Sequence, residues 1–421
     1  MPDDSGSSPG PKQEAKQAAR QAAGRGLDWL NLFVANVQTG FGPFISVYLT
    51  TAGWTQTSIG LALSLGTVAA MASQVPAGAL VDAIRRKSRV AVFSILAFTA
   101  SALFLTVAPI PLFVYLAQVL HAFSSCTLGP AIVAMSRGVA GPAALGPRLG
   151  RNVRFAAIGN GIGAALMGAC GYYFSERSVF FLTALLTLPA LLAIVPLARF
   201  DDQAATERGV TPEAGERRKS LLAVLTDRRL LIFAVMVALF TFANAAMLPL
   251  ASSVITKHAV DEASLLIAAA IVLPQAIVAL LSPTIGRMAE VRGRRLVLIL
   301  GFGIVPIRAL LLALTDDPML MVAIQALDGL AAASFGVMVP LVTSDITGRS
   351  GHFNLSLGVV GFAIGVGATF STTAAGWTSD QFGDPAAFLM LAMAGLVAWL
   401  LVAAAMPETR PTSCERTQKE Q

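Results

Sequence analysis

The sequence predicts an all-α polytopic membrane protein with twelve transmembrane helices, arranged as two six-helix bundles related by pseudo-two-fold symmetry. Three observations lead to this fold class: the composition, a series of long apolar stretches, and motifs that occur once in each half. Hydrophobic residues make up 55% of the 421 residues, charged residues make up 13%, and the mean hydropathy is +0.70. Soluble domains carry about 25% charged residues, so this chain has too few to cover a water-facing surface. Disordered, fibrous and ordinary cytosolic proteins are excluded.

The predicted spans each approach the roughly 20 apolar residues that a helix needs to cross a bilayer core. They are residues 28–50, 56–80, 90–109, 111–136, 152–174, 179–198, 229–252, 264–284, 296–314, 318–343, 355–376 and 385–406. The resulting parts are a disordered cytoplasmic arm (1–26), an N-terminal bundle (27–199), a cytoplasmic connector (200–228), a C-terminal bundle (229–406) and a cytoplasmic tail (407–421). The arm lacks an apolar core, so no signal peptide is expected.

Basic residues are distributed unevenly between the two sides of the membrane. With the N-terminus in the cytoplasm, 27 of the 30 Lys and Arg residues fall on the cytoplasmic side. The exceptions are Arg177 and Lys257 in loops on the other side and Arg308 within a span. Short loops that keep positive charge in the cytoplasm set the orientation of a membrane protein. Both termini are therefore expected in the cytoplasm, with the chain in the inner membrane.

An internal repeat relates the two halves at an offset near 207 residues. Repeats of this kind place a substrate site at the interface between the halves. The matched pairs are Gln118 with Gln325, His121 with Asp328, Gly129 with Gly336, Gly141 with Gly348, Gly78 with Gly286, Asp82 with Glu290, Asn36 with Asn244, and Ile158-Gly159 with Ile364-Gly365. Their order along the two halves is the same, which predicts a six-helix unit used twice in parallel orientation.

The loop between spans two and three contains Gly78-x-x-x-Asp82, followed by the basic run Arg85-Arg86-Lys87. The second copy reads Gly286-x-x-x-Glu290-Val-Arg-Gly-Arg294-Arg295. With twelve spans and a charged central connector, this loop resembles the signature of the major facilitator superfamily over about residues 28–406. Ala83 and Arg85 depart from the family pattern of a basic residue and a glycine.

The resemblance implies a transporter whose cytoplasmic gate is latched by an ion pair of Asp82. Arg137, at the cytoplasmic end of the fourth span, is its expected partner, while the basic residues of the loop are also explained as topology signals. The expected gate residues are Gly78, Asp82, Arg86, Lys87, Arg137, Gly286, Glu290, Arg294 and Arg295.

The fifth span resembles the antiporter signature of drug exporters in the same family. Gly150, Gly159, Gly163 and Gly168 occupy signature positions, whereas Ala164 and Met167 replace a proline and a glycine. The resemblance favours export in exchange for protons. These glycines are also expected to let helices approach closely.

Polar groups within the spans are the candidate substrate and proton residues, because an intramembrane charge is costly and needs a reason. Asp328 and His121 each lie about ten residues into a span, near the middle of the bilayer, and either could carry the proton. The predicted pathway comprises Asp328, His121, Gln118, Gln325, Asn36, Gln38 and Asn244; interhelical hydrogen bonding is the alternative role for each. Arg308 is expected to extend outward to Asp316 or Asp317, with Asp328 as the alternative partner.

The leading function is proton-coupled export of a small organic molecule. The alternatives are proton-coupled uptake of a nutrient, metal chelate or siderophore, and a non-transporting sensor or assembly protein. The three cysteines show no metal-binding spacing, and no P-loop or hydrolase motif occurs, so neither an enzyme nor an ATP-driven pump is expected. No cofactor, metal or nucleic-acid partner is expected, and the protein is expected to be a monomer in the lipid bilayer. Without a central Arg, a neutral or cationic substrate is favoured.

Overall fold

The computed structural model of the chain describes residues 11–39, 41, 43–54, 56–141, 144–207, 226–258, 263–347 and 352–409. The helices of the first half are α1 (Pro11–Thr39), α2 (Pro43–Thr51), α3 (Gln56–Ala83), α4 (Lys87–Val107), α5 (Pro111–Ala140), α6 (Leu145–Tyr173) and α7 (Glu176–Glu207). Those of the second half are α9 (Arg228–Ala245), α10 (Met247–His258), α11 (Ala263–Arg292), α12 (Arg294–Ala313), α13 (Pro318–Ile324), α14 (Ala326–Thr347), α15 (Phe353–Phe382) and α16 (Asp384–Ala405).

Eleven helical segments among the described residues are long and apolar enough to cross a membrane. The pairs α9–α10 and α13–α14 each form one of these segments. The first predicted span falls on α1 and α2, which are separate helices on either side of residues 40–42. The all-helical fold class predicted from the sequence is confirmed.

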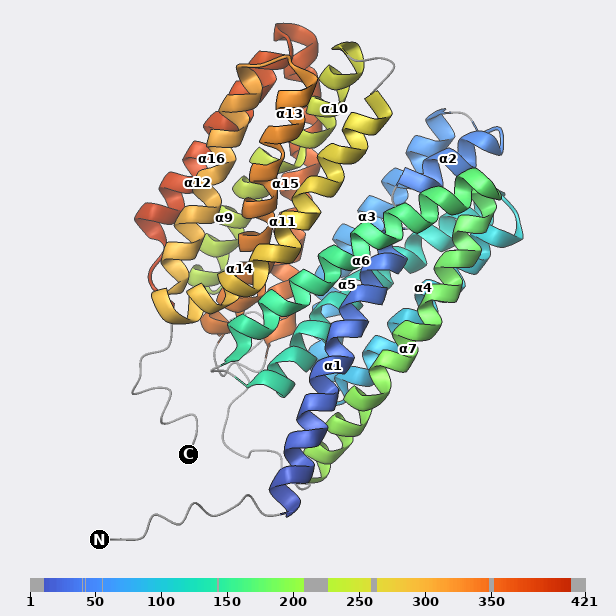
Figure 1. Cartoon of the computed structure of the whole chain (residues 1–421), viewed down its shortest axis with the longest axis vertical. Coiled ribbons are helices and arrows are strands. Elements are labelled where there is room, and N and C mark those ends of the chain that lie inside the picture. The colour runs from blue at the N-terminus through green and yellow to red at the C-terminus, as the bar shows by residue number, and fades with distance from the viewer. Residues whose placement is uncertain are drawn as a thin grey trace.

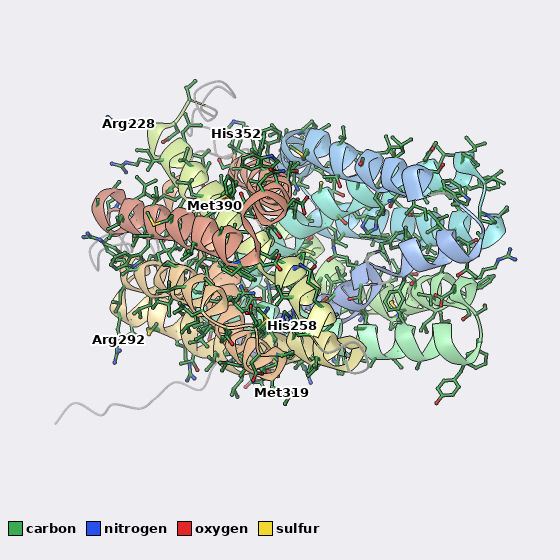
Figure 2. The ribbon with its side chains drawn as sticks, turned by 90° about the horizontal axis from the view of Figure 1, so that it is seen from above. Arg228, His258, Arg292, Met319, His352 and Met390 are labelled. Atoms are coloured by element: carbon green, nitrogen blue, oxygen red, sulfur yellow. The ribbon has the colours of Figure 1, made fainter. Side chains whose placement is uncertain are left out.

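The helices form two bundles that lie side by side (Figure 1). Each bundle has its own apolar core, with Phe98 and Phe180 fully buried in the first and Phe233 and Phe388 fully buried in the second. The bundles meet around α6, α11 and α14, toward the end of the molecule where α1 begins, and diverge toward the end that carries α2 and α10 (Figure 1). Figure 2, turned by 90°, shows the blue-to-green helices on one side and the yellow-to-red helices on the other.

The order of the helices repeats between the halves. α4 and α12 begin at Lys87 and Arg294, an offset of 207, and α6 and α15 begin at Leu145 and Phe353, an offset of 208. The interruption between α1 and α2 has a counterpart between α9 and α10. The internal repeat seen in the motifs therefore extends to the helices themselves.

The structure changes two predicted boundaries and adds a contact in the predicted tail. Residues 11–26, predicted to be disordered, belong to α1, because Ala23 is buried and Arg20 donates hydrogen bonds to the carbonyl oxygens of Val139 and Ala140 at 2.5 and 2.6 Å. The connector begins later than predicted, since α7 continues to Glu207; residues 208–225 lie outside the described residues. In the predicted tail, Glu408 accepts hydrogen bonds from the first amides of α12, and residues 410–421 lie outside the described residues.

Candidate functional site

The two bundles touch mainly along two helix pairs, α3 with α15 and α6 with α11, with smaller contacts of α6 with α14 and of α5 with α15. A Cβ atom on Gly78 of α3 would overlap the carbonyl group of Asn354, and one on Gly286 of α11 would overlap the carbonyl group of Gly146. The two contacts are equivalent under the internal repeat, because Gly286 lies 208 residues after Gly78 and Asn354 lies 208 residues after Gly146. Only glycine permits backbones to approach this closely. The predicted gate glycines therefore form two symmetry-related contacts between the halves.

The second layer of these contacts repeats the same pattern. A Cβ atom on Gly358 would overlap the carbonyl oxygen of Gln74, and one on Gly150 would overlap that of Ser282. These two contacts are also equivalent under the repeat, since Gly358 lies 208 residues after Gly150 and Ser282 lies 208 residues after Gln74. Gly150 thus contributes to the interface between bundles, rather than to packing within the first bundle.

The two gate acids, Asp82 and Glu290, bind backbone amides at the starts of helices in the opposite half, where the amides have no partner within the helix. Asp82 accepts hydrogen bonds from the backbone amides of Asn354 and Leu355 at 3.1 and 2.8 Å, and from the Asn354 side chain at 2.6 Å. Glu290 accepts a hydrogen bond from the backbone amide of Gly146 at 3.1 Å. The first amides of a helix lack intrahelical partners and carry partial positive charge, so a carboxylate there is favourable. These bonds hold α15 to α3 and α6 to α11.

The basic gate residues mostly bind within their own half. Lys87 donates to the carbonyl oxygens of Val81 and Ile84 at the end of α3, at 2.5 and 2.7 Å. Arg295 donates to the carbonyl oxygen of Ala403 at 2.7 Å. Arg86 immediately precedes α4.

Arg294 and Arg137 differ from these residues in their surroundings. Arg294 is buried and pairs with Glu290 at 3.0 Å and with Asp345 at 3.1 Å. The Arg137 guanidinium lies over the ring of Phe353, 5.6 Å from its centroid, next to the residues that Asp82 binds. The three hydrogen bonds that Asp82 accepts come from α15, which the sequence did not predict.

Two of the remaining α6 glycines pack against α1. Added Cβ atoms on Gly159 and Gly163 would overlap the backbone of Leu32 and the side chain of Asn36. Gly168 does not belong to this set, because a Cβ atom there would meet nothing within 4 Å. The packing role predicted for it needs correction for that reason.

The C-terminal bundle contains a buried ionic network centred on Arg308 of α12. Its Nη1 atom donates to Asp328 Oδ1 at 2.5 Å and to Asn244 Oδ1 at 2.7 Å, and its Nη2 atom donates to Gln325 Oε1. The Arg308 side chain is 1% exposed and that of Asp328 is 22% exposed. Asp328 is the one acid paired with Arg308 within the described residues. The network brings together three of the predicted pathway residues, on α9, α14 and the junction of α13 and α14.

The expected contact of Arg308 with Asp316 or Asp317 is wrong, because Asp328 is its partner. A charged guanidinium within a span finds a nearer counter-ion in the interior than at the membrane surface. The hairpin geometry could have shown this. α12 and α13 are antiparallel and turn at residues 314–317, so Arg308 lies level with Gln325, one turn from Asp328. Arg308 is thus a buried arginine within a span, and the expectation of a neutral or cationic substrate, which assumed that there was none, loses its basis.

The N-terminal pathway residues form a different, largely uncharged group. The His121 ring stacks on Phe41 with centroids 4.2 Å apart and meets the edge of Phe98 at 5.0 Å, and its buried Nδ1 atom has no hydrogen-bond partner among the described residues. Gln118 donates to the carbonyl oxygen of Ala62 of α3 at 3.3 Å. No contact in the described residues joins His121 to Asp328.

Two more pathway residues lie on α1. Asn36 is buried against Gly163, and its Oδ1 atom has no hydrogen-bond partner in the part of the chain that the structure describes. Gln38 is partly exposed near the end of the helix. Neither residue is part of the Arg308 network.

One buried charge cluster was not predicted from the sequence. Asp28 of α1 pairs with Arg148 and with Arg151 of α6, the latter at 2.6 Å. Arg148 also donates to Asn152 at 2.9 Å and to the carbonyl oxygen of Gly24 at 3.0 Å. The signal was available, because an acid at the start of the first span needs a cation within reach. The cluster fixes the long start of α1 against α6.

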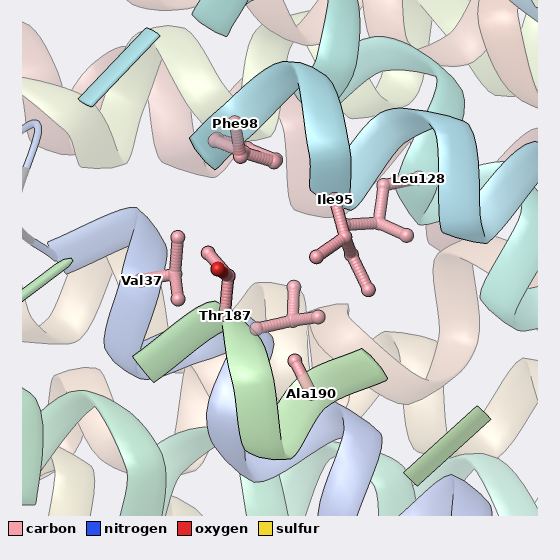
Figure 3. A pocket seen from close by; sticks show the side chains of 7 residues that line it. Val37, Ile95, Phe98, Leu128, Thr187 and Ala190 are labelled. Carbon is pink, nitrogen blue, oxygen red and sulfur yellow. The ribbon is translucent and has the colours of Figure 1, made fainter. Parts of the chain in front are cut away.

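The N-terminal bundle also contains a small apolar gap between α1, α4, α5 and α7 (Figure 3). Its lining residues are Val34, Val37, Ile95, Phe98, Leu128, Thr187 and Ala190. One hydroxyl group among apolar side chains offers little to a polar ligand, so the gap is a packing feature of the bundle core.

The contacts between the bundles are concentrated at one end of the molecule. They extend from Asp82 and Glu290 to the level of Met71, which lies against Gly365. Beyond this level the bundles diverge (Figure 1). The molecule is therefore closed at the end where α1 begins and separated at the opposite end.

Comparisons with known proteins agree with this architecture. The sequence model of the Major Facilitator Superfamily matches residues 28–272 and 237–421. An uncharacterized MFS-type transporter of Mycobacterium tuberculosis, found in two strains, is 37% identical over 394 residues, covering 91% of this chain and 93% of the relative. The crystal structure of the MFS transporter FucP in the outward conformation has a TM-score of 0.63 at 16% identity, covering 91% of this chain and 97% of FucP. The likeness to FucP concerns the fold.

Proposed function

Because this chain belongs to the major facilitator superfamily, we propose that it is a secondary active transporter that moves a small organic molecule by coupling its passage to protons. The observation that carries the proposal is the Arg308–Asp328 pair in the membrane interior. An ion pair at this depth is costly and needs compensating hydrogen bonds, which Asn244 and Gln325 supply. A residue with an ionised and a neutral form at that place can link proton binding to a change of conformation.

Alternating access explains the two-bundle arrangement. The gate glycines and the two gate acids hold one end closed, and rocking of one bundle on the other would break these contacts and form new ones at the opposite end. With the basic loops in the cytoplasm, the closed end is the cytoplasmic one, and the described conformation faces outward in the inner membrane. The protein would act as a monomer, since both halves of the pathway lie in one chain.

Export in exchange for protons is the first candidate direction. Gly150, Gly159 and Gly163 support it, because they occupy positions of the antiporter signature and each makes a close helix contact. Uptake together with a proton is the second candidate. The Arg308–Asp328 pair favours it, because a ligand that takes the place of Asp328 on Arg308 leaves the carboxylate free to accept a proton.

The test is proton-driven flux in proteoliposomes for the wild type, Asp328→Asn and His121→Gln. Asp328→Asn keeps the shape of the acid and mimics its protonated form, so exchange without a gradient is expected to persist while accumulation against a gradient is lost. His121→Gln is expected to shift the pH optimum and to retain some coupling. Wild-type accumulation by Asp328→Asn would refute the role of this acid and move the coupling site to His121.

A further inference from the structure

We infer that the transported molecule carries an anionic group, and that this group binds Arg308 in the position that the Asp328 carboxylate occupies in the described conformation. The inference rests on the proposed transport function and deepens it, because it assigns the charge of the substrate. It replaces the expectation of a neutral or cationic substrate.

The first observation concerns the charges in the network. Arg308 carries a fixed positive charge and is almost completely buried, while Asp328 is the partly exposed partner. Since a guanidinium stays protonated in proteins, the charge of Arg308 must always be balanced. A cationic ligand at Asp328 would be repelled by Arg308, and a neutral ligand that displaced Asp328 would leave Arg308 uncompensated. An anion can replace the carboxylate without either penalty.

The second observation is that the network has more donors than acceptors. Arg308 Nε and Gln325 Nε2 are buried and have no hydrogen-bond partner among the described residues. Gln325 is 0% exposed, and its Oε1 atom already accepts from Arg308, which fixes the orientation of the amide. Buried donors without acceptors are uncommon in folded proteins. A carboxylate, sulfonate or phosphate group has several acceptor oxygens and could serve donors that the single Asp328 oxygen does not reach.

The exchange of anions also specifies the coupling. When the ligand anion binds Arg308, Asp328 loses its counter-ion in a site of low polarity. Uptake of one proton from solvent then removes that unpaired negative charge. Within the described residues, Arg308 is the one charged side chain paired with Asp328, and the neighbouring network residues Asn244 and Gln325 do not titrate. Anion and proton therefore bind together, as in the uptake alternative.

The first experiment tests the anion site by replacing the missing carboxylate. In Asp328→Ala the side chain ends at Cβ, which leaves room for formate beside Arg308. Sodium formate is expected to raise the melting temperature of the purified variant above its value in sodium chloride of equal ionic strength. Neutral formamide should not raise the melting temperature of Asp328→Ala. In the double variant Arg308→Gln/Asp328→Ala, the melting temperature should be the same in sodium formate and in sodium chloride. No rise with formate in Asp328→Ala would overturn the inference.

The second experiment tests the wild-type protein with two probes of similar shape, benzenesulfonate and neutral benzenesulfonamide. Benzenesulfonate stays ionised throughout, so stronger binding in mildly acidic than in neutral solution would report proton uptake by the protein. Asp328→Asn is expected to bind it roughly tenfold more tightly, without that pH dependence. Equal binding of both probes by Asp328→Asn would refute an anionic substrate. Gradient-driven transport by the wild type is a separate measurement, so its presence would show that only the substrate class had failed.

Discussion

At the scale of single residues, the Arg308–Asp328 pair is asymmetric in what each partner can tolerate. Asp328 can become neutral by binding a proton, whereas Arg308 cannot lose its charge. Removing one partner of a buried pair costs about 3–5 kcal/mol when the other is left charged. Replacement of both partners by apolar residues of similar volume is often close to neutral.

We therefore expect Asp328→Leu to destabilise the protein by about 3–5 kcal/mol, and Arg308→Met by clearly less, because the remaining acid can bind a proton. The double variant should be more stable than Asp328→Leu. The measurement is thermal unfolding of each purified variant in detergent. As a control, Asp384→Leu removes the acid of the Lys257–Asp384 pair but leaves a cation that is 57% exposed and can be solvated, so it should cost less than Asp328→Leu. Equal losses for Asp328→Leu and Arg308→Met would contradict the asymmetry.

At the scale of helices, the closed end depends on contacts that only glycine allows. Gly150 and Gly168 lie on the same helix, yet a Cβ atom on the first would overlap the Ser282 carbonyl group and one on the second would meet open space. Backbone cannot move aside as a flexible side chain can, so a methyl group at 150 must push α6 away from α11. The substitution therefore destabilises the closed conformation, in which α6 and α11 touch, and leaves the open conformation unaffected.

Gly150→Ala is expected to shift the population toward the open gate, whereas Gly168→Ala should not. The measurement is the labelling rate, in a cysteine-free background, of a single cysteine introduced at Ser282, which is buried between the bundles. Faster labelling in Gly150→Ala than in Gly168→Ala is the expected result. Equal rates in the two variants would mean that α6 and α11 separate without using this contact.

At the scale of the whole molecule, the orientation in the membrane can be checked with a cysteine that the chain already has. Cys414 follows the last helix, and the start of α12, which Glu408 binds, lies at the closed end. In a variant that lacks Cys126 and Cys170, a membrane-impermeant maleimide is expected to label Cys414 in inside-out vesicles and not in intact cells. Labelling from the outside would reverse the orientation, and the described conformation would then face the cytoplasm.

Composition and repeats were sufficient to predict the fold, because helix length and loop charge are properties of local sequence. The contacts between the bundles were also located, since Gly78, Asp82, Gly286 and Glu290 stand in a motif. The partners were harder to predict. Asp82 binds backbone amides of α15, and amides carry no sequence signal. The partner of Arg308 does not follow from the sequence alone, because Asp316 and Asp317 are nearer to it along the chain than Asp328 of α14, which the fold places beside it.

The equal spacing of the gate contacts has a consequence for the history of the chain. Gln74, Gly78, Gly146 and Gly150 have their counterparts 208 residues later, at Ser282, Gly286, Asn354 and Gly358, whereas α4 and α12 begin 207 residues apart. If the halves arose by duplication of one ancestral gene, the loops before α4 and after α5 have each changed in length by one residue, and the offset of 206 at Ile158-Gly159 marks a further difference within α6. A substitution at one of these contact positions therefore has a sister position whose number is 208 higher. Asp82→Asn and Glu290→Gln are equivalent substitutions in the two halves. A difference between their effects would measure how far the two halves have diverged in function.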